Sequence, residues 1–335
     1  MMKSRMYIFW LAALTICLSI VSFKEHVCVD STWGFYGHKK INELAVYTLP
    51  EAMFGFYKAN LDYIIDHSVD PDKRRYGVKG EAECHYIDMD HYMDAEHPDP
   101  FANVPRRWTE AVEKFSEDTL RAHGIVPWNV YLVTQKLTTA FKNEDLNRIL
   151  RLSAELGHYI GDAHVPLHTT SNYNGQQTGQ RGIHGFWESR VPELYSNEYD
   201  LFTGKAEYIN SPLNFIWDRV EESFAGVDSV LGFERDLNGK FSDDRKYTYE
   251  TRGQVSMKVY SQEYSQAYST MLDGQVERRM RQAVIAIGSY WYTAWVDGGQ
   301  PDLNKLIAKA QIAENDTLGT DGQPLQKLKV RDHDN

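Results

Sequence analysis

The stretch "LGHYIGDAHVPLHTT", residues 156–170, is the most informative segment of the chain. It places three histidines and an aspartate within eleven residues: His158, Asp162, His164 and His168. Residues four apart share a face of a helix, so His158 and Asp162 are predicted to point the same way. Pro166 is expected to end that helix and to present His168 from the turn beyond it. Imidazole and carboxylate groups bind zinc, so the segment is a candidate metal site. An isolated HxxxD pair is equally compatible with an ordinary histidine, whereas the longer HxxxDxHxPLH pattern is far rarer by chance.

Further candidate ligands lie on both sides of this stretch. "GIHGFWES" places His184 and Glu188 four residues apart, although a helix N-terminus with an ordinary acid explains that pair as well. Upstream, "DHSVDPDKRRYG" and "ECHYIDMDHY" offer Asp70 and His85, and the residues alone do not distinguish Asp70 from its neighbouring acids Asp66 and Asp72. "STWGFYGHKK" offers His38, five residues after Trp33.

The start of the chain has the pattern of a secretory signal. Lys3 and Arg5 precede an uncharged apolar run that ends near Ser22, which matches a basic region followed by a hydrophobic region. We expect residues 1–22 to be a signal peptide, cleaved between 22 and 32, and the protein to be periplasmic or secreted. A membrane anchor and a lipid anchor at Cys17 are the less favoured alternatives.

Charge and cysteine content narrow the class of protein. The net charge of the 335-residue chain is −11, and removing residues 1–22, which carry Lys3 and Arg5 and no acid, makes it −13. An acidic chain argues against broad, salt-driven duplex binding, but metal ions can supply positive charge at a local site. Cys28 and Cys84 could form one disulfide if cleavage leaves Cys28 on the mature chain.

Hydrophobic periodicity between residues 37 and 296 is mainly helical. The apolar fraction of 42% provides enough material for a core. We therefore predict an all-α fold, a single compact multi-helix domain over residues 33–300, with irregular loops at about 71–108, 169–182 and 232–250. No alternating strand is expected, and the segment after residue 254 is interpreted as two helices that meet near Gly274. Residues 301–335 are expected to form a polar, partly disordered C-terminal extension.

Together these motifs resemble the superfamily of zinc-dependent bacterial phospholipases C and single-strand-specific fungal nucleases (the S-one/P-one type). The resemblance covers roughly Trp33 to Val296. It implies an α-helical domain with a trinuclear zinc cleft that hydrolyses phosphate esters. Matching the motifs residue by residue implies nine metal ligands: Trp33, His38, Asp70, His85, His158, Asp162, His168, His184 and Glu188.

The resemblance also divides these ligands among three zinc ions. Trp33, His38 and Asp162 would hold the first. Asp70, His85 and His158 would hold the second, also with Asp162, which would bridge two ions. The third would be held by His168, His184 and Glu188.

Other roles follow from the same resemblance. Asp90, or else Asp88, is expected to orient the attacking water or to accept its proton, although either could be a loop acid that caps a helix. Lys73 stands near the position of a phosphate-binding arginine, and Tyr86 could stack on a base or pack in the core. His164 is not a ligand in the family, so we expect it to orient a ligand or to pack beneath the site.

The motifs contain features of both the nuclease and the phospholipase branch of this superfamily. The family's tryptophan is usually the mature N-terminus, whereas the apolar run here ends about ten residues before Trp33. The spacings of five residues between Trp33 and His38 and of fifteen between Asp70 and His85 resemble those of the nucleases. The glutamate at Glu188 and the short spacing of sixteen residues between His168 and His184 resemble those of the phospholipases.

We therefore expect a zinc-dependent phosphodiesterase, phospholipase C-like, with a single-strand-specific nuclease as the alternative. The expected substrate is a phospholipid or single-stranded nucleic acid, and we expect a monomer without a stable protein partner. A non-enzymatic zinc-binding protein is the alternative of another class. A di-iron bundle would need repeated Glu-x-x-His pairs, which the sequence lacks.

Overall fold

The computed structural model describes residues 32–252 and 255–307. The expected signal peptide, Cys17, Cys28 and most of the C-terminal extension lie outside the described residues, as does the side chain of Trp33. The chain divides into two compact units, Met1–Thr32 and Trp33–Asn335. Every described helix and strand lies in the second unit, except that the first helix begins at Thr32.

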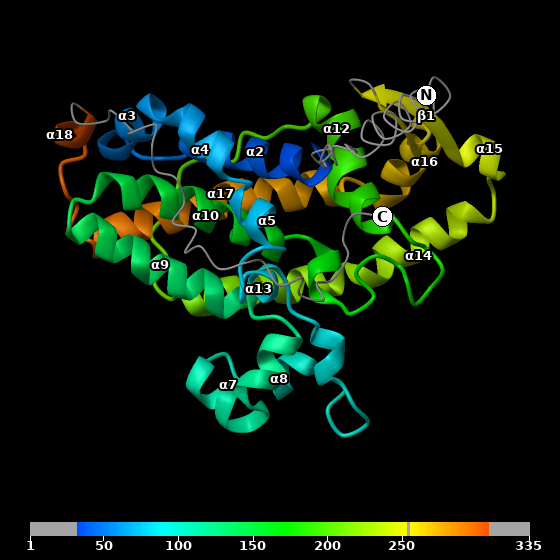
Figure 1. The fold of residues 1–335 in the computed structure, drawn as a ribbon, viewed down its shortest axis with the longest axis horizontal. Helices are drawn as coiled ribbons and strands as arrows, with labels where there is room; N and C mark the ends of the chain where they lie inside the picture. The colour runs from blue at the N-terminus through cyan, green and yellow to red at the C-terminus, as the bar shows by residue number, and fades with distance from the viewer. Residues whose placement is uncertain (1–31, 253–254, 308–335) are drawn as a thin grey trace, which may run out of the picture. The chain divides into compact units, whose positions relative to one another are not determined.

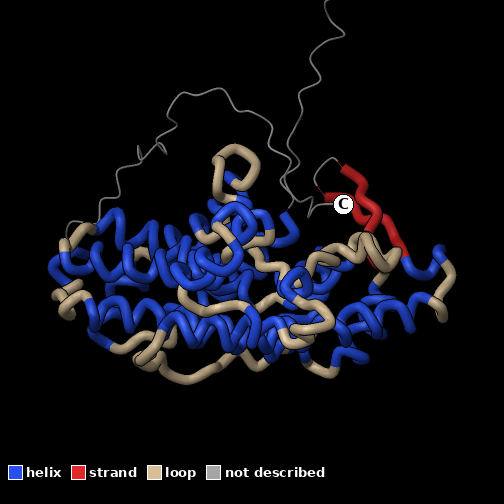
Figure 2. The backbone as a smooth tube through the Cα atoms, turned by 90° about the horizontal axis from the view of Figure 1, so that it is seen from below, coloured by secondary structure: helices blue, strands red, loops and turns tan. Residues whose placement is uncertain are grey.

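Nearly all regular secondary structure in the described part of this unit is helical, which confirms the predicted fold class (Figures 1 and 2). Its first half contains α2 (Thr32–Val46), α3 (Glu51–Ala59), α4 (Leu61–His67), α5 (Asp70–Arg74), η1 (Ala82–His85), η2 (Met89–Tyr92), α6 (Pro100–Asn103), α7 (Trp108–Phe115), α8 (Glu117–Ala122) and α9 (Val126–Lys142). Its second half contains α10 (Leu146–Ala163), η3 (Pro166–Thr169), α11 (Ile183–Gly185), η4 (Phe186–Arg190), α12 (Val191–Tyr195), η5 (Ser196–Glu198), α13 (Pro212–Ala225), α14 (Val227–Asn238), α15 (Asp243–Lys246), α16 (Gln262–Leu272), α17 (Gln275–Asp297) and α18 (Asn304–Ile307).

The expectation that strands are absent was wrong. Strands β1 (Tyr247–Arg252) and β2 (Val255–Tyr260) form an antiparallel hairpin in which Tyr247 pairs with Tyr260 (red in Figure 2). Most of the hairpin faces solvent, and its buried positions are confined to its last residues, Val259 and Tyr260. Val255, Met257 and Val259 alternate with polar residues in the sequence, which is a signal for a strand. These residues were instead interpreted as the start of the helix that leads to Gly274.

The helical stretch formed by α3 and α4 is divided at Asn60, whose side chain donates to the carbonyl of Phe56. One other expected feature differs in detail. The expected loop at 232–250 begins inside α14, which continues to Asn238. The division near Gly274 is confirmed, because α16 ends at Leu272 and α17 begins at Gln275.

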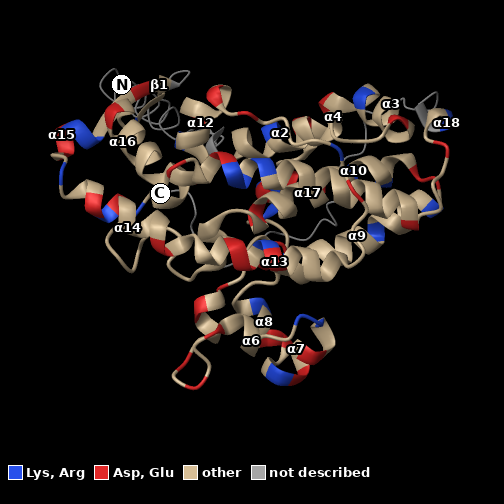
Figure 3. Cartoon of the chain, turned by 180° about the vertical axis from the view of Figure 1, so that it is seen from behind, with Lys and Arg blue, Asp and Glu red and all other residues tan. Residues whose placement is uncertain are grey.

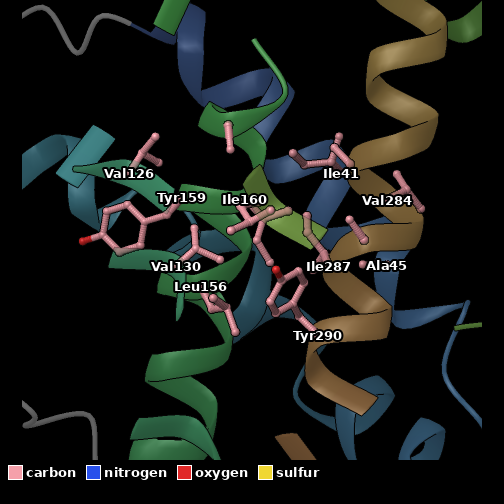
Figure 4. Close-up of a cluster of buried hydrophobic side chains, with 14 of the residues drawn as sticks. Ile41, Ala45, Val126, Val130, Leu156, Tyr159, Ile160, Val284, Ile287 and Tyr290 are labelled. Atoms are coloured by element: carbon pink, nitrogen blue, oxygen red, sulfur yellow. The ribbon is translucent and has the colours of Figure 1, made fainter. Parts of the chain in front are cut away.

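Helix α10 is central to the core. It packs against α9 and α17 and is buried on several faces. The side chain of its N-cap, Asp145, accepts a hydrogen bond from the amide of Arg148 at 3.2 Å, a standard helix start. Leu156, Tyr159 and Ile160 lie in an apolar cluster with residues of α2, α9 and α17 (Figure 4). This burial fixes α10, which carries the motif, inside the domain.

Helix α2 approaches α10 and α17 very closely. A methyl group built on Gly157 would lie 1.9 Å from Oδ1 of Asn42, and one built on Gly288 would lie 1.9 Å from Oγ1 of Thr48. Glycine at both positions therefore allows α2 to approach each neighbouring helix. Since α2 also carries His38, this packing determines where that imidazole lies.

None of the helices within residues 32–252 and 255–307 has both the length and the hydrophobicity needed to cross a bilayer.

Candidate metal centre

Six short segments bring histidine and carboxylate side chains together. Helix α10 supplies His158 and Asp162, which lie on one face as the four-residue spacing predicts, with His158 Nε2 3.3 Å from Asp162 Oδ2. The other segments are α2, α5, η1, η3 and the continuous helical stretch formed by α11 and η4. Three groups of possible ligand atoms each lie within 4.8 Å of one another: His38 with Asp72 and His158, His85 with His158 and Asp162, and His168 with His184 and Glu188.

Asp162 lies at the middle of these groups. Its Oδ2 atom is 2.9 Å from Nδ1 of His85, and its Oδ1 atom is 3.3 Å from Nε2 of His38 and 3.6 Å from Nε2 of His168. Asp162 is almost completely buried, with 1% of its surface exposed. One carboxylate thus faces imidazoles from three other segments, a geometry that suits a ligand shared between metal ions.

His168, His184 and Glu188 form a second focus. Glu188 Oε2 is 3.0 Å from Nε2 of His184 and 3.4 Å from Nε2 of His168. Glu188 lies in η4, a π-helical turn, and such turns often occur at functional sites. The pair that the sequence left open, His184 and Glu188, is thus helical and faces a third possible ligand.

The structure brings Asp72 to the cluster rather than Asp70. Oδ1 of Asp72 is 3.7 Å from both Nδ1 of His85 and Nε2 of His158. Asp70 instead pairs with His67 at 2.5 Å and with Lys73 at 2.9 Å. Both acids belong to the short helix α5, and residues two apart on a helix point in different directions. The resemblance implied Asp70 as the ligand, whereas the structure places Asp72 among the groups that could hold a metal.

The separations between ligand atoms suit zinc. Two ligands at about 2.0–2.1 Å from a tetrahedral ion lie roughly 3.3 Å apart. The imidazole–carboxylate contacts in the cluster range from 2.9 Å for His85 with Asp162 to 3.7 Å for His85 with Asp72, on either side of that value.

The orientation of three imidazoles also suits a metal. In each of them Nδ1 faces a backbone carbonyl. Nδ1 of His158 lies 2.8 Å from the carbonyl of Ser68, that of His168 lies 2.6 Å from the carbonyl of His85, and that of His184 lies 3.1 Å from the carbonyl of Tyr173. A carbonyl only accepts hydrogen bonds, so Nδ1 donates and Nε2 is the nitrogen that faces the cluster. Zinc-binding histidines commonly donate a hydrogen bond from their other ring nitrogen in this way.

The cluster also concentrates buried negative charge. Asp72, Asp162 and Glu188 each belong to one of the three groups of possible ligands, and Arg75 contributes a guanidinium group 3.2 Å from Asp72. Burial alone would raise the pKa of the Asp162 carboxyl, but the imidazoles of His158 and His168 hold that pKa well below its usual value. Burial acts on the pKa of Glu188 in the same way, and His184 and His168 again hold it low. Buried carboxylates need cationic partners, so the donor set fits divalent metal ions.

The two expected catalytic acids have different surroundings. Asp90 accepts hydrogen bonds from the hydroxyls of Thr170 and Ser171, each at 2.8 Å, and from the amide of Ser171 at 2.9 Å. Its carboxylate is thus fixed to the segment that follows His168. Asp88 is buried, and its carboxylate lies 3.7 Å from Nδ1 of His123.

The remaining expected residues lie in simpler positions. Lys73 pairs with Asp70, as described above, and its side chain is half exposed. The carbonyl of Tyr86 accepts a hydrogen bond from Val126 at 3.1 Å, and Gly124 packs directly against its backbone. Nδ1 of His164 donates to the carbonyl of Ile160 at 2.7 Å, and His164 lines a cavity of about 50 Å³ together with His38. The thiol of Cys84 donates to the carbonyl of Gly80. Because Cys28 lies outside the described residues, its pairing with Cys84 stays a prediction.

Sequence reasoning missed three residues at or behind the cluster: Asp72, Arg75 and Glu81. Asp72 and Arg75 are three residues apart, so they lie on one face of a helix. This spacing could have indicated from the sequence that the two side chains lie close together. Glu81 is four residues before His85, and its Oε1 atom is 3.6 Å from Nε2 of that histidine. An i, i+4 pair is informative only if the segment is known to be helical. Because residues 71–108 were expected to form a loop, this pair was not recognised.

The fold was compared with those of solved structures. Two solved structures that resemble it are the alpha-toxin of Clostridium perfringens from an avian strain and the alpha toxin of Clostridium absonum. The TM-scores are 0.44 and 0.42, and the sequence identities are 12% and 14%. In both cases the match covers 81% of this chain and 65% of the other chain, which is less than two thirds of the toxin's length.

No curated protein matches the chain in the sequence comparison. Residues 33–294, in contrast, match the S1/P1 Nuclease family. Because this match spans most of the sequence, the chain belongs to the S1/P1 nuclease family.

Proposed function

We propose that the protein is a secreted, trinuclear zinc phosphodiesterase that cleaves single-stranded nucleic acid. The observation that supports this most directly is that five buried imidazoles and three carboxylates, Asp162 among them, gather in three neighbouring groups. Each group would hold one metal ion. His158 belongs to two of the groups, and Asp162, which contacts both His38 and His85, would be shared between two ions. The main chain of Trp33 would complete the position that contains His38.

When bound, zinc ions activate water for attack on phosphorus and polarise the phosphate oxygens. The chain's own residues determine how the substrate is held. Arg75 lies at the cluster with a permanently charged guanidinium, which suits a phosphate oxygen better than the half-exposed Lys73 does. Burial opposes the charge of Arg75, but Asp72 and Asp162 keep its pKa above the usual arginine value.

Asp90 is the residue we propose to orient the water or to accept its proton. The hydrogen bonds from Thr170 and Ser171 fix its carboxylate in one orientation. A general base must be held within hydrogen-bond reach of the proton that it removes. Asp88 is the weaker candidate, because its carboxylate faces His123.

The family match favours nucleic acid as the substrate. Acidic and basic residues are interspersed over the described part of the chain (Figure 3), so strand recognition would depend on the metal site and Arg75 rather than on a broad basic surface. Phospholipid is the second candidate. It is favoured by the spacing of the third ligand group. His184 comes only sixteen residues after His168, and the carboxylate ligand that follows is a glutamate, Glu188, rather than an aspartate.

The test is a parallel assay of the purified mature protein on single-stranded DNA, RNA, a 3′-nucleotide and phosphatidylcholine vesicles. Metal analysis and N-terminal sequencing accompany it. We expect three zinc ions, hydrolysis of the nucleic acids, and loss of activity in Asp162→Asn. Asp66→Asn is the matched control, because Asp66 is exposed and its one ion pair among residues 32–252 and 255–307 is with Lys39 on the surface, so that its loss has little effect.

The assay separates the three candidate functions. Hydrolysis of phosphatidylcholine alone would replace nucleic acid with phospholipid as the substrate. Tightly bound zinc without hydrolysis of any phosphate ester would favour the non-enzymatic alternative. N-terminal sequencing tests the proposed cleavage, since a chain that begins at Trp33 places a free amine next to the site.

A further inference from the structure

The imidazole of His85 is held differently from those of the other histidines in the cluster. His158, His168 and His184 direct Nδ1 to a backbone carbonyl and Nε2 to the cluster. His85 is reversed, because its Nδ1 atom lies 2.9 Å from Asp162 Oδ2 and 3.0 Å from His158 Nε2. Its Nε2 atom is therefore on the far side of the ring and carries the proton when Nδ1 binds a metal.

That far side faces a carboxylate rather than a carbonyl. Oε1 of Glu81 lies 3.6 Å from Nε2 of His85, which is longer than a hydrogen bond but close for a charged group in a buried place. Both side chains are shielded from solvent, with 8% of Glu81 and none of His85 exposed. Nε2 of His85 has no hydrogen-bond partner among the described residues.

Glu81 is itself held firmly. Its Oε2 atom accepts from Nε of Arg74 at 2.9 Å, and its Oε1 atom accepts from the hydroxyl of Tyr159. Arg74 also donates to Glu155 at 2.8 Å and to the Tyr159 hydroxyl at 3.0 Å. The ring of Tyr159 packs edge-on against the ring of His85. This network joins α5, η1 and α10 behind the metal cluster.

We propose that Glu81 is the positioning residue for His85 and forms a carboxylate–imidazole–metal arrangement at one of the zinc sites. The anionic carboxylate fixes the orientation of the ring and makes Nδ1 a stronger donor, as such partners do for zinc-binding histidines. The inference rests on the metal-binding part of the proposed function. It adds a residue that touches neither metal nor substrate.

The test compares two carboxylates of the same network. Glu81→Gln removes the charge that faces His85 and keeps the shape of the side chain. Glu155→Gln removes an equally buried charge that also pairs with Arg74, but Glu155 does not face an imidazole of the cluster. Zinc affinity is measured by competition with a chromogenic chelator, and thermal unfolding is measured on the metal-free proteins.

We expect Glu81→Gln to weaken one zinc site about 10–100-fold, the usual effect of losing such a partner. Glu155→Gln should leave all sites within about 2-fold, while the two metal-free variants lose similar stability. Equal zinc affinities in the two variants, whether both fall or neither does, would overturn the role of Glu81. A wild-type protein that binds no zinc would instead overturn the proposed function.

If Glu81→Gln does not fold, Tyr159→Phe provides the second measurement. It keeps every charge and removes only the hydroxyl that fixes Oε1 of Glu81. We expect a loss of zinc affinity at one site of about 3–10-fold, smaller than that for a deleted carboxylate. Unchanged affinity in a folded Tyr159→Phe protein would contradict the proposal.

Discussion

Replacing Gly157 with alanine tests whether the contact between α2 and α10 holds the metal centre together. The added methyl group would lie 1.9 Å from Oδ1 of Asn42, whereas carbon and oxygen approach each other to about 3.3 Å. Asn42 is fully buried and donates to the carbonyl of His38 at 2.8 Å. Its amide therefore has little room to move, and moving it disturbs the helix that carries a metal ligand.

The expected free-energy change is the sum of opposing effects. Alanine is favoured over glycine inside a helix by about 1 kcal/mol. Overpacking a core costs about 1–3 kcal/mol, and breaking the buried hydrogen bond of Asn42 costs about 1–3 kcal/mol more. We expect Gly157→Ala to lower the free energy of unfolding by about 3 kcal/mol and to release zinc from the group that contains His38.

The assay is chemical denaturation of the metal-free protein, together with zinc counting on the loaded protein. Gly232→Ala is the matched control, because Gly232 is also inside a helix and the nearest atom to its added methyl group, Nη2 of Arg235, is 3.8 Å away. It should be neutral or stabilised by up to about 1 kcal/mol. A Gly157→Ala protein as stable as the wild type would refute the packing argument. A destabilised variant that keeps all its zinc would refute the link to the site.

Other expected outcomes concern the metal and the proposed catalytic residues. Removing zinc with a chelator should lower the melting temperature, because bound metal stabilises only the folded state, and zinc should restore it, as calorimetry can show. Asp72→Asn should reduce the zinc content measured by atomic emission more than Asp70→Asn does; the opposite order would return Asp70 to the site. Arg75→Met should raise KM for the phosphodiester with zinc content unchanged, and an unaltered KM would remove Arg75 from substrate binding. Asp90→Asn should lower kcat by about 10²–10⁴-fold while zinc stays bound, and a variant that loses zinc instead would make Asp90 a structural residue.

The helical core could be predicted because its signals are local and periodic. The apolar residues of α10 recur at helical spacing, and Pro166 marks its end. The hairpin was missed although Val255, Met257 and Val259 alternate with polar residues, because so short an alternation directly before a longer helical pattern was counted as part of that helix. Short helices such as α5 and η1 were missed because four or five residues contain too little periodicity to be recognised.

The amino-acid sequence by itself determined the ligand types and the helical face that carries them. His158 and Asp162 are four residues apart in a helix that ends before Pro166. Helix geometry therefore places them on one face, whatever the rest of the fold. Only the tertiary structure decided which acid of α5 faces the cluster, which nitrogen of His85 turns inward, and that Glu81 lies behind it. These choices depend on how α2, α5 and η1 pack against α10. Contacts between segments far apart in the chain leave no periodic signal in the sequence.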